Sequence, residues 1–197
     1  SMNSKKFLAF AMAAAMTLSM TACGGSGSGA ASSGTDSTAG TAFKLGGTGP
    51  LTGGASIYGL AAQRGAQIAV DEINAQGGAI QFDLKYEDDQ HDPEKAVNAY
   101  NALKEWGMQI SLGSVTSQPG ISTSALNQED GIFALTPSAS SPDVIAGKDN
   151  VYQMCFSDPN QGLASAQYIA EQQLGEKIFI IWKSDDNYST GIKDKFM

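Results

Sequence analysis

The chain has 197 residues and a formal net charge of −8, from 12 basic and 20 acidic side chains. This acidic excess argues against nucleic acid or an anionic lipid surface as the partner. Because the chain has only two cysteines and one histidine, with neither zinc-ligand spacing nor a phosphate-binding loop, we expect no metal and no cofactor.

The first segment, residues 1–22, is typical of a secretory signal peptide. Lys5 and Lys6 precede an uncharged run that is too short to span a bilayer comfortably as a helix. The run ends in Met20-Thr21-Ala22-Cys23, which resembles a bacterial lipobox, where cleavage occurs before a cysteine that is then acylated. We predict an exported protein lipidated on Cys23. An ordinary signal peptide with an incidental cysteine is the alternative.

Residues 23–42 are nearly all Gly, Ser, Ala and Thr, apart from Cys23 itself. Such a segment buries little apolar surface and behaves as a flexible coil. We therefore predict a tether that holds a globular body away from the membrane.

Two isolated residues, Cys155 and His91, have chemistry that needs an interpretation. With Cys23 lipidated, Cys155 has no partner for an intramolecular disulfide, and we interpret it as a small buried residue near a strand end rather than a reactive thiol. His91 lies among Glu87, Asp88, Asp89 and Asp92. A solvated acidic loop is favoured there over a metal site.

From Phe43 onward, strand-like runs alternate with helical ones. We predict strands at 43–45, 82–86, 110–112, 132–135 and 177–182, the last of them buried, and an extended connector at 151–156. We predict helices at 57–75, from Pro93, at 119–128 and at 161–174.

Two of these helices show a packing face. The first has small residues on one side, namely Ala62, Gly65, Ala66, Ala69 and Ile73. The helix from Pro93 has Ala96, Ala99, Leu103 and Trp106 on one side.

Strands alternating with helices of this length predict an α/β fold with a parallel sheet and helices on both faces. Ligands of such sheets bind beyond the carboxyl ends of the strands. The loops predicted there are 46–58, 113–119, 136–142 and 184–191. They are rich in Gly, Ser, Thr and Tyr and poor in Lys and Arg, which favours a small zwitterion over a nucleotide.

Segments at these loops match a known family in order and spacing. They are Gly49-Pro50-Leu51-Thr52-Gly53, Ala69-Val70-Asp71-Glu72-Ile73-Asn74, Asp88-Asp89-Gln90, Gly113-Ser114-Val115-Thr116-Ser117, Thr136-Pro137-Ser138-Ala139-Ser140-Ser141-Pro142 and Asp186-Asn187-Tyr188-Ser189-Thr190-Gly191. Through them the chain resembles the branched-chain amino-acid (Leu/Ile/Val-type) binding proteins of ABC transporters, in the type I periplasmic binding protein family.

The resemblance implies a Venus flytrap fold, in which two α/β lobes close on a ligand. Residues 43–156 would form lobe one, incomplete without later chain, and 157–197 the start of a truncated lobe two. In the family pattern, Ser117 and Ser140 match the hydroxyls that contact the ligand α-carboxylate and α-amino groups. Val115 and Ser138 match positions that contribute backbone groups, and the aromatic walls are Tyr58 and Tyr188.

The residues support part of this site independently. Ser117-Gln118-Pro119 and Ser140-Ser141-Pro142 each place a hydroxyl and a free amide just before a proline, which favours the first turn of a helix. Helix starts present unpaired N–H groups and a partial positive charge that suit a carboxylate. Plain helix capping without a ligand is the alternative.

We therefore predict a receptor rather than an enzyme, lipid-anchored to the outer face of the plasma membrane. It would deliver an amino acid, branched-chain or otherwise apolar, to ABC permease subunits. A ligand-sensing ectodomain of the same fold that feeds a signalling partner is the alternative. A repressor-type relative is disfavoured by the export signal and the lack of a helix-turn-helix, and a hydrolase by the lack of a Gly-x-Ser-x-Gly elbow.

Overall fold

In the computed structural model, which describes residues 41–197, five strands form one parallel sheet in the order β2-β1-β3-β4-β5. The predicted signal peptide, Cys23 and the tether up to residue 40 lie outside the described residues. The strands are β1 (Thr41–Gly49), β2 (Ile80–Asp88), β3 (Ile110–Ser114), β4 (Ala134–Thr136) and β5 (Val151–Gln153).

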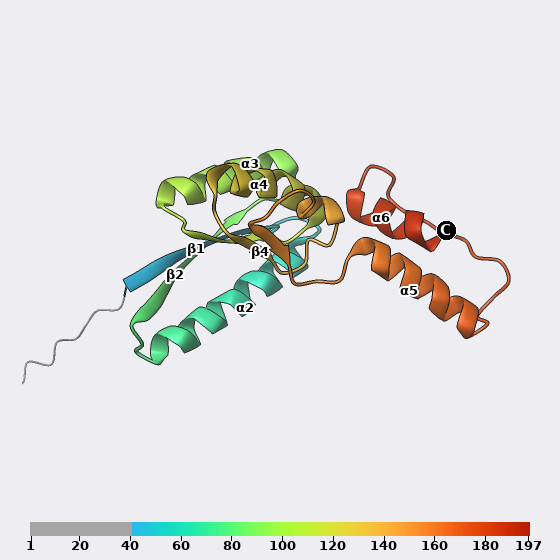
Figure 1. Ribbon diagram of the computed structural model, residues 1–197, viewed down its shortest axis with the longest axis horizontal. Coiled ribbons are helices and arrows are strands. Elements are labelled where there is room, and N and C mark those ends of the chain that lie inside the picture. The colour runs from blue at the N-terminus through green and yellow to red at the C-terminus, as the bar shows by residue number, and fades with distance from the viewer. Residues whose placement is uncertain (1–40) are drawn as a thin grey trace, which may run out of the picture. The chain divides into compact units, whose positions relative to one another are not determined.

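Helices cover both faces of this sheet, as predicted. Figure 1 shows α2 on one face and α3 with α4 on the other. The helices are α2 (Ser56–Ala75), α3 (Pro93–Trp106), α4 (Ser117–Asp130), the short 3-10 helix η1 (Pro142–Val144), α5 (Asp158–Glu171) and α6 (Asn187–Phe196). None of the helices between residues 41 and 197 has the length and apolar character that crossing a membrane requires.

The strand order creates a switch point beside β1. The chain passes from β1 through α2 to β2 on one side, and then through α3 to β3 on the other side of β1. The loops after β1 and β3 therefore diverge at the carboxyl edge of the sheet. In open α/β sheets, this divergence leaves a crevice for a ligand.

Several element boundaries differ from the prediction. β1 begins at Thr41, two residues before Phe43, and α4 begins at Ser117 rather than at Pro119. The predicted connector 151–156 contains a true strand, because β5 pairs in parallel with β4 and buries Val151.

The predicted buried strand at 177–182 is wrong. These residues form no regular element, and the side chains of Phe179 and Ile181 are 87% and 86% exposed. A strand needs a neighbour to accept its backbone hydrogen bonds, and no described strand lies beside this segment. An apolar run alone therefore does not produce a strand here.

The predicted packing face is confirmed on α3 and is wrong in part on α2. On α3, Ala96, Ala99 and Leu103 are buried, as expected. On α2 the predicted face is wrong in part, because Gly65 and Ala69 are exposed whereas Gly59 and Val70 are buried. Gly59 sets this orientation, since a Cβ there would lie 2.1 Å from the carbonyl oxygen of Pro50.

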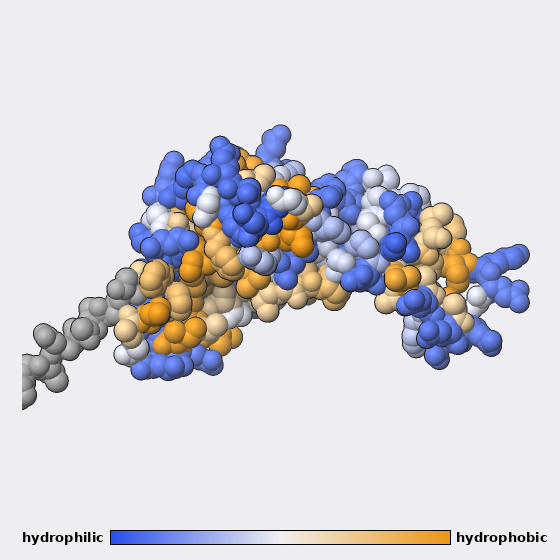
Figure 2. Space-filling model, viewed as in Figure 1, coloured by the Kyte–Doolittle hydropathy of each residue, from blue (hydrophilic) through white to orange (hydrophobic). Residues whose placement is uncertain are grey.

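Other large apolar side chains of α2 stay on the surface, among them Ile57 and Ile68. Ile57 is 71% and Ile68 59% exposed. Figure 2 shows apolar surface over α2 and near the end of α5.

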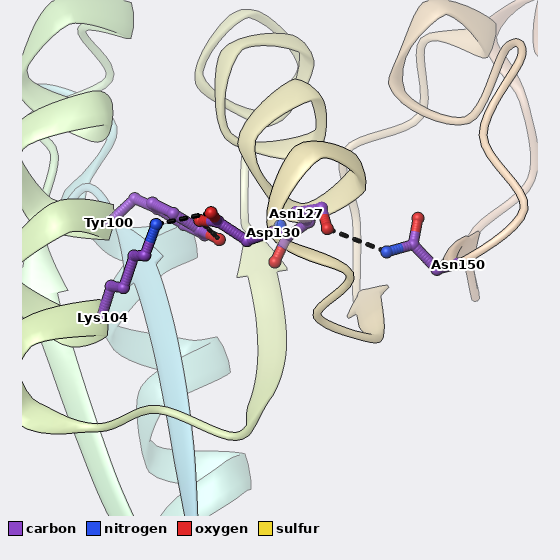
Figure 3. A network of polar contacts seen from close by, with 5 residues as sticks. All are labelled: Tyr100, Lys104, Asn127, Asp130 and Asn150. Atoms are coloured by element: carbon purple, nitrogen blue, oxygen red, sulfur yellow. Dashed lines mark hydrogen bonds and ion pairs between the residues drawn. The ribbon is translucent and has the colours of Figure 1, made fainter.

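The sheet face under α3 and α4 is held by a small core and a polar network. Tyr100 and Leu103 are each 1% exposed and pack with Met108. The Tyr100 hydroxyl donates to Asp130 Oδ2 at 2.8 Å, and Lys104 pairs with the same carboxylate (Figure 3). These bonds join α3 to the C-terminal end of α4.

Candidate ligand-binding site

A cavity of about 580 Å³ lies beyond the carboxyl ends of the strands. Loops that follow β1, β2, β3, β4 and β5 all contribute to it, as does the segment around the start of α6. The lining residues are Ala55, Tyr58, His91, Val115, Thr116, Ser117, Pro137, Ser138, Ser140, Cys155, Phe156, Lys183, Asp186 and Tyr188.

The structure brings all six predicted site residues into this one lining. They come from positions up to 130 residues apart, namely Tyr58, Val115, Ser117, Ser138, Ser140 and Tyr188. Their contact with a ligand stays a prediction.

Ser117 is the first residue of α4 and is 4% exposed. Its Oγ accepts a hydrogen bond from the Ser141 amide at 3.2 Å. Because the oxygen accepts from the protein, the hydroxyl proton remains free to donate to an acceptor in the cavity. Ser117 is therefore suited to a negatively charged ligand oxygen.

The N-terminus of α4 is left without a side-chain cap. Thr116 occupies the cap position with extended backbone angles, yet its hydroxyl makes no bond to the helix. Instead, a 2.9 Å hydrogen bond joins Thr116 Oγ1 to His91 Nδ1. The amides of Ser117 and Gln118 have no acceptor among the described residues. Free N–H groups at a helix start favour an anion.

Ser140 lies beside a buried carboxylate. The Asp158 amide donates to the Ser140 carbonyl at 3.1 Å, and the Asp158 side chain is fully buried. Burial raises the pKa of the Asp158 carboxyl; the nearby Ser140 hydroxyl opposes that rise, and the charge of Asp186 adds to it. Neither carboxylate oxygen has a partner of hydrogen-bond geometry within residues 41–197. A cation near Ser140 would stabilise this charge.

Val115 and Ser138 are engaged with each other. The Ser138 hydroxyl donates to the Val115 carbonyl, and the Val115 amide donates to the Thr48 carbonyl at 3.2 Å. The Val115 amide is therefore not free to donate to a ligand. The backbone contact that the resemblance implied for Val115 does not come from this N–H. The Ser138 amide has no acceptor among the described residues and remains available.

The second proline loop differs from the prediction. Pro142 opens only the three-residue η1, and the Ser141 hydroxyl caps it by accepting from the Asp143 amide. The two loops therefore supply one α-helix start and one turn, not two helix starts. Ser140 lies outside η1.

Aromatic side chains form the apolar part of the lining. Tyr58 and Phe156 are 64% and 66% exposed, and Tyr188 is 41% exposed. Such rings offer unburied apolar surface to a ligand side chain.

The structure corrects the interpretation of both His91 and Cys155. His91 is half-buried, lines the cavity and bonds Thr116, so it is not simply part of a solvated loop. Cys155 lies just past β5, as expected, but it is only partly buried and also lines the cavity. Burial raises the pKa of its thiol, which favours the protonated, unreactive form. Within residues 41–197 no cluster of three or more potential ligands is arranged for a metal ion.

Sequence reasoning also missed Asp186, Lys183 and Phe156 in the lining. For Asp186 a signal existed, since Asp followed by Asn-Tyr-Ser is a helix-cap pattern and the structure has Asp186 accepting from the Ser189 amide. Phe156 follows β5, and its place at the carboxyl edge depends on a strand that was not predicted.

The chain is similar to several known binding proteins. A Leu/Ile/Val-binding protein of Rhizobium johnstonii is 34% identical over 150 residues, which cover 75% of this chain and 41% of the relative. The substrate-binding protein LivJ of Streptococcus pneumoniae, solved with isoleucine, superposes with a TM-score of 0.74 at 28% identity, covering 79% of this chain and 46% of LivJ. A substrate-binding protein of Desulfitobacterium hafniense, solved with Leu, gives a TM-score of 0.65 at 28% identity, with 79% and 46% covered.

The chain spans less than half the length of these relatives. The family model for periplasmic binding proteins matches residues 42–197, most of the chain. The chain therefore belongs to the periplasmic binding protein family.

Proposed function

We propose that the chain is part of an extracytoplasmic receptor that binds a branched-chain or similarly apolar amino acid and delivers it to an ABC importer. The observation that carries this proposal is the uncapped start of α4 beside Ser117, in the same cavity as Ser140. The names of the Rhizobium johnstonii and Streptococcus pneumoniae relatives support the ligand class.

The proposed recognition divides the ligand into three parts. The α-carboxylate accepts from the Ser117 hydroxyl and from the first amides of α4. The α-ammonium lies near Ser140, where the charge of Asp158 has no other partner in the described chain. Tyr58 and Tyr188 contact the apolar side chain. No step makes or breaks a covalent bond, so the function is binding and not catalysis.

Calorimetry on the full-length protein tests the proposal. L-leucine, L-isoleucine and L-valine should bind, whereas leucine methyl ester and N-acetyl-leucine should bind poorly, because each lacks one of the two charges. Ser117→Ala and Ser140→Ala should each weaken leucine binding about ten- to hundredfold, the size of a hydrogen bond to a charged group. Ser165→Ala, an exposed serine on α5 outside the cavity, is the control. Equal binding of acid and ester would show that the carboxylate site is elsewhere.

Lipid anchoring through Cys23 is part of the same proposal. A lipobox-like Met20-Thr21-Ala22-Cys23 and a Gly/Ser-rich tether support it. Two acyl chains give stable membrane attachment, whereas one does not. Membrane association should be lost on Cys23→Ala in a bacterial host, and unchanged fractionation would exclude the anchor.

The lobe boundary is also proposed, with residues 43–156 in lobe one and 157–197 beginning lobe two. After β5 the chain leaves the sheet, and α5 packs mainly against α6. A Cβ on Gly162 of α5 would lie 2.3 Å from the carbonyl of Ile192 in α6, so the two helices approach backbone to backbone.

A further inference from the structure

We infer that His91 is a positioning residue, which keeps the Thr116 hydroxyl away from the start of α4 and so leaves the helix amides free for the ligand carboxylate. The ligand part of this inference rests on the proposed function. The contact between His91 and Thr116 does not.

Thr116 has the type and the backbone of a capping residue. Threonine is among the preferred helix caps, and its φ of −118° and ψ of 155° are those of a normal cap position. A threonine there would ordinarily accept from the second or third amide of the helix. The third residue of α4 is Pro119, which has no N–H, so the amide within reach is that of Gln118.

His91 explains why this cap is not made. Its Nδ1 lies 2.9 Å from Thr116 Oγ1, and the two residues are 25 positions apart in the sequence. With Thr116 Oγ1 positioned at the imidazole, this oxygen makes no bond to the Gln118 amide. Both residues line the cavity, so the bond is made at the wall where the carboxylate is proposed to lie.

The backbone of His91 supports this position. Its φ is +60°, in the left-handed region, and its amide donates to Asp89 Oδ1 at 2.9 Å. Asp89 is itself fully buried, and its amide donates to the Gly49 carbonyl at 3.0 Å. The imidazole therefore projects from a turn that is fixed to the end of β1.

Hydrogen exchange in the ligand-free protein tests the contact first. In the wild type the Gln118 amide should exchange as an unprotected group. His91→Gly tolerates the left-handed φ but removes the imidazole, so Thr116 should turn to cap the helix and slow exchange of this amide about fivefold, the size of a typical cap. The double variant His91→Gly/Thr116→Val has no hydroxyl and should exchange as fast as the wild type.

Two matched variants separate this role from a merely structural one. His91→Asn keeps the left-handed preference and places an amide group where Nδ1 lies, so exchange should stay fast. Gln90 is the adjacent residue with a left-handed φ, of +52°, and its side chain accepts from Lys95 rather than bonding Thr116. Gln90→Gly should therefore leave the exchange rate of the Gln118 amide unchanged. Unchanged Gln118 exchange in His91→Gly would overturn the inference.

Leucine titration of the full-length protein then tests the consequence. His91→Gly should bind leucine about fivefold more weakly, since the ligand must displace the new cap, and adding Thr116→Val should recover most of that loss. Wild-type affinity in His91→Gly would refute the consequence. If the wild type binds no amino acid while exchange behaves as expected, the proposed function fails and the role of His91 in holding Thr116 stands.

Discussion

The N-termini of α3 and α4 both follow residues that commonly cap helices, and the two caps are used in opposite ways. At α3, Asp92 accepts from the amides of Glu94 and Lys95 at 3.0 and 2.9 Å, so the helix start is satisfied internally. At α4, the Thr116 hydroxyl bonds His91 and the first amides stay free. Asp92 is not part of the cavity lining, whereas Thr116 is. The helix start outside the cavity lining is capped by a side chain, and the helix start in the lining is not.

The largest expected effect comes from giving α4 the cap of α3. Thr116→Asp should accept from the Gln118 amide and place a negative charge beside the ligand carboxylate. We expect leucine affinity to fall at least about hundredfold, since a charge-assisted bond is lost and a repulsion is added. Calorimetry on the full-length protein measures this.

Two milder substitutions at this position sharpen the comparison. Thr116→Asn caps without charge and should fall between wild type and Thr116→Asp, and Thr116→Ser should bind like the wild type. Wild-type affinity in Thr116→Asp would show that the open helix start does not contact the ligand.

The second effect concerns Asp158, a buried carboxylate next to Ser140 that has no hydrogen-bond partner among the described residues. Asp158→Asn removes an uncompensated buried charge, so the free energy of unfolding at neutral pH should rise by about 1–3 kcal/mol while leucine binds more weakly. Chemical denaturation with and without leucine measures both changes.

The sign of the pH dependence follows from the raised pKa of Asp158. Between the ordinary aspartate pKa and the raised value, the folded state binds more protons than the unfolded state, so this group lowers stability as pH rises. The stability difference between Asp158→Asn and wild type should therefore shrink as pH falls through that window. A difference that stays constant with pH would mean that the pKa of Asp158 is the same in the folded and unfolded states.

The third effect concerns the capped helix start, which is that of α3. Asp92→Ala removes both cap bonds of α3 and should lower the free energy of unfolding by about 1–2 kcal/mol. Leucine affinity should stay within about twofold of the wild type, because α3 begins outside the cavity. Glu94→Ala, which removes a first-turn acid but no cap, should cost only a few tenths of a kcal/mol in the same assay. A large loss of affinity in Asp92→Ala would undo the distinction between the two helix starts.

The smallest effect is expected at the C-terminal ends of α3 and α4. Lys104→Met breaks the exposed ion pair with Asp130 and should change the free energy of unfolding by about 0.5 kcal/mol or less, with a dependence on salt. Denaturation at low and high ionic strength measures it. A loss above 2 kcal/mol would mean that the pair, and not the Tyr100 and Leu103 core, holds α3 to α4.

The helix α3 could be predicted from the sequence, whereas the structure of residues 177–182 could not. α3 was predicted because Pro93 and the buried positions Ala96, Ala99 and Leu103 are local signals, and a helix satisfies its own backbone. A strand depends on a neighbour, so the apolar run at 177–182 did not determine its structure, and β5 was found only through its pairing with β4.

The candidate site shows the same limit. The Ser-x-Pro loops and the family pattern identified Ser117 and Ser140 in advance. The role of His91 could not be predicted from the sequence, because it depends on one contact between residues 25 positions apart and on the rotamer of Thr116. Asp158 was hidden for a similar reason: its burial depends on how α5 packs against α6.

Hydrogen bonds link the five loops at the carboxyl edge into a continuous series. Asp88 accepts from the Leu51 amide, His91 bonds Thr116, the Ser141 amide donates to Ser117, and the Gln153 side chain donates to the carbonyls of Ala139 and Ser141. A wall assembled in this way loses little conformational freedom when a ligand arrives, so its contribution to binding is largely the same for every amino acid. Discrimination between ligands would then fall to the aromatic side chains of the lining, Tyr58 and Tyr188, and substitutions there should alter ligand preference, whereas those at the hydrogen-bonded wall should alter only affinity.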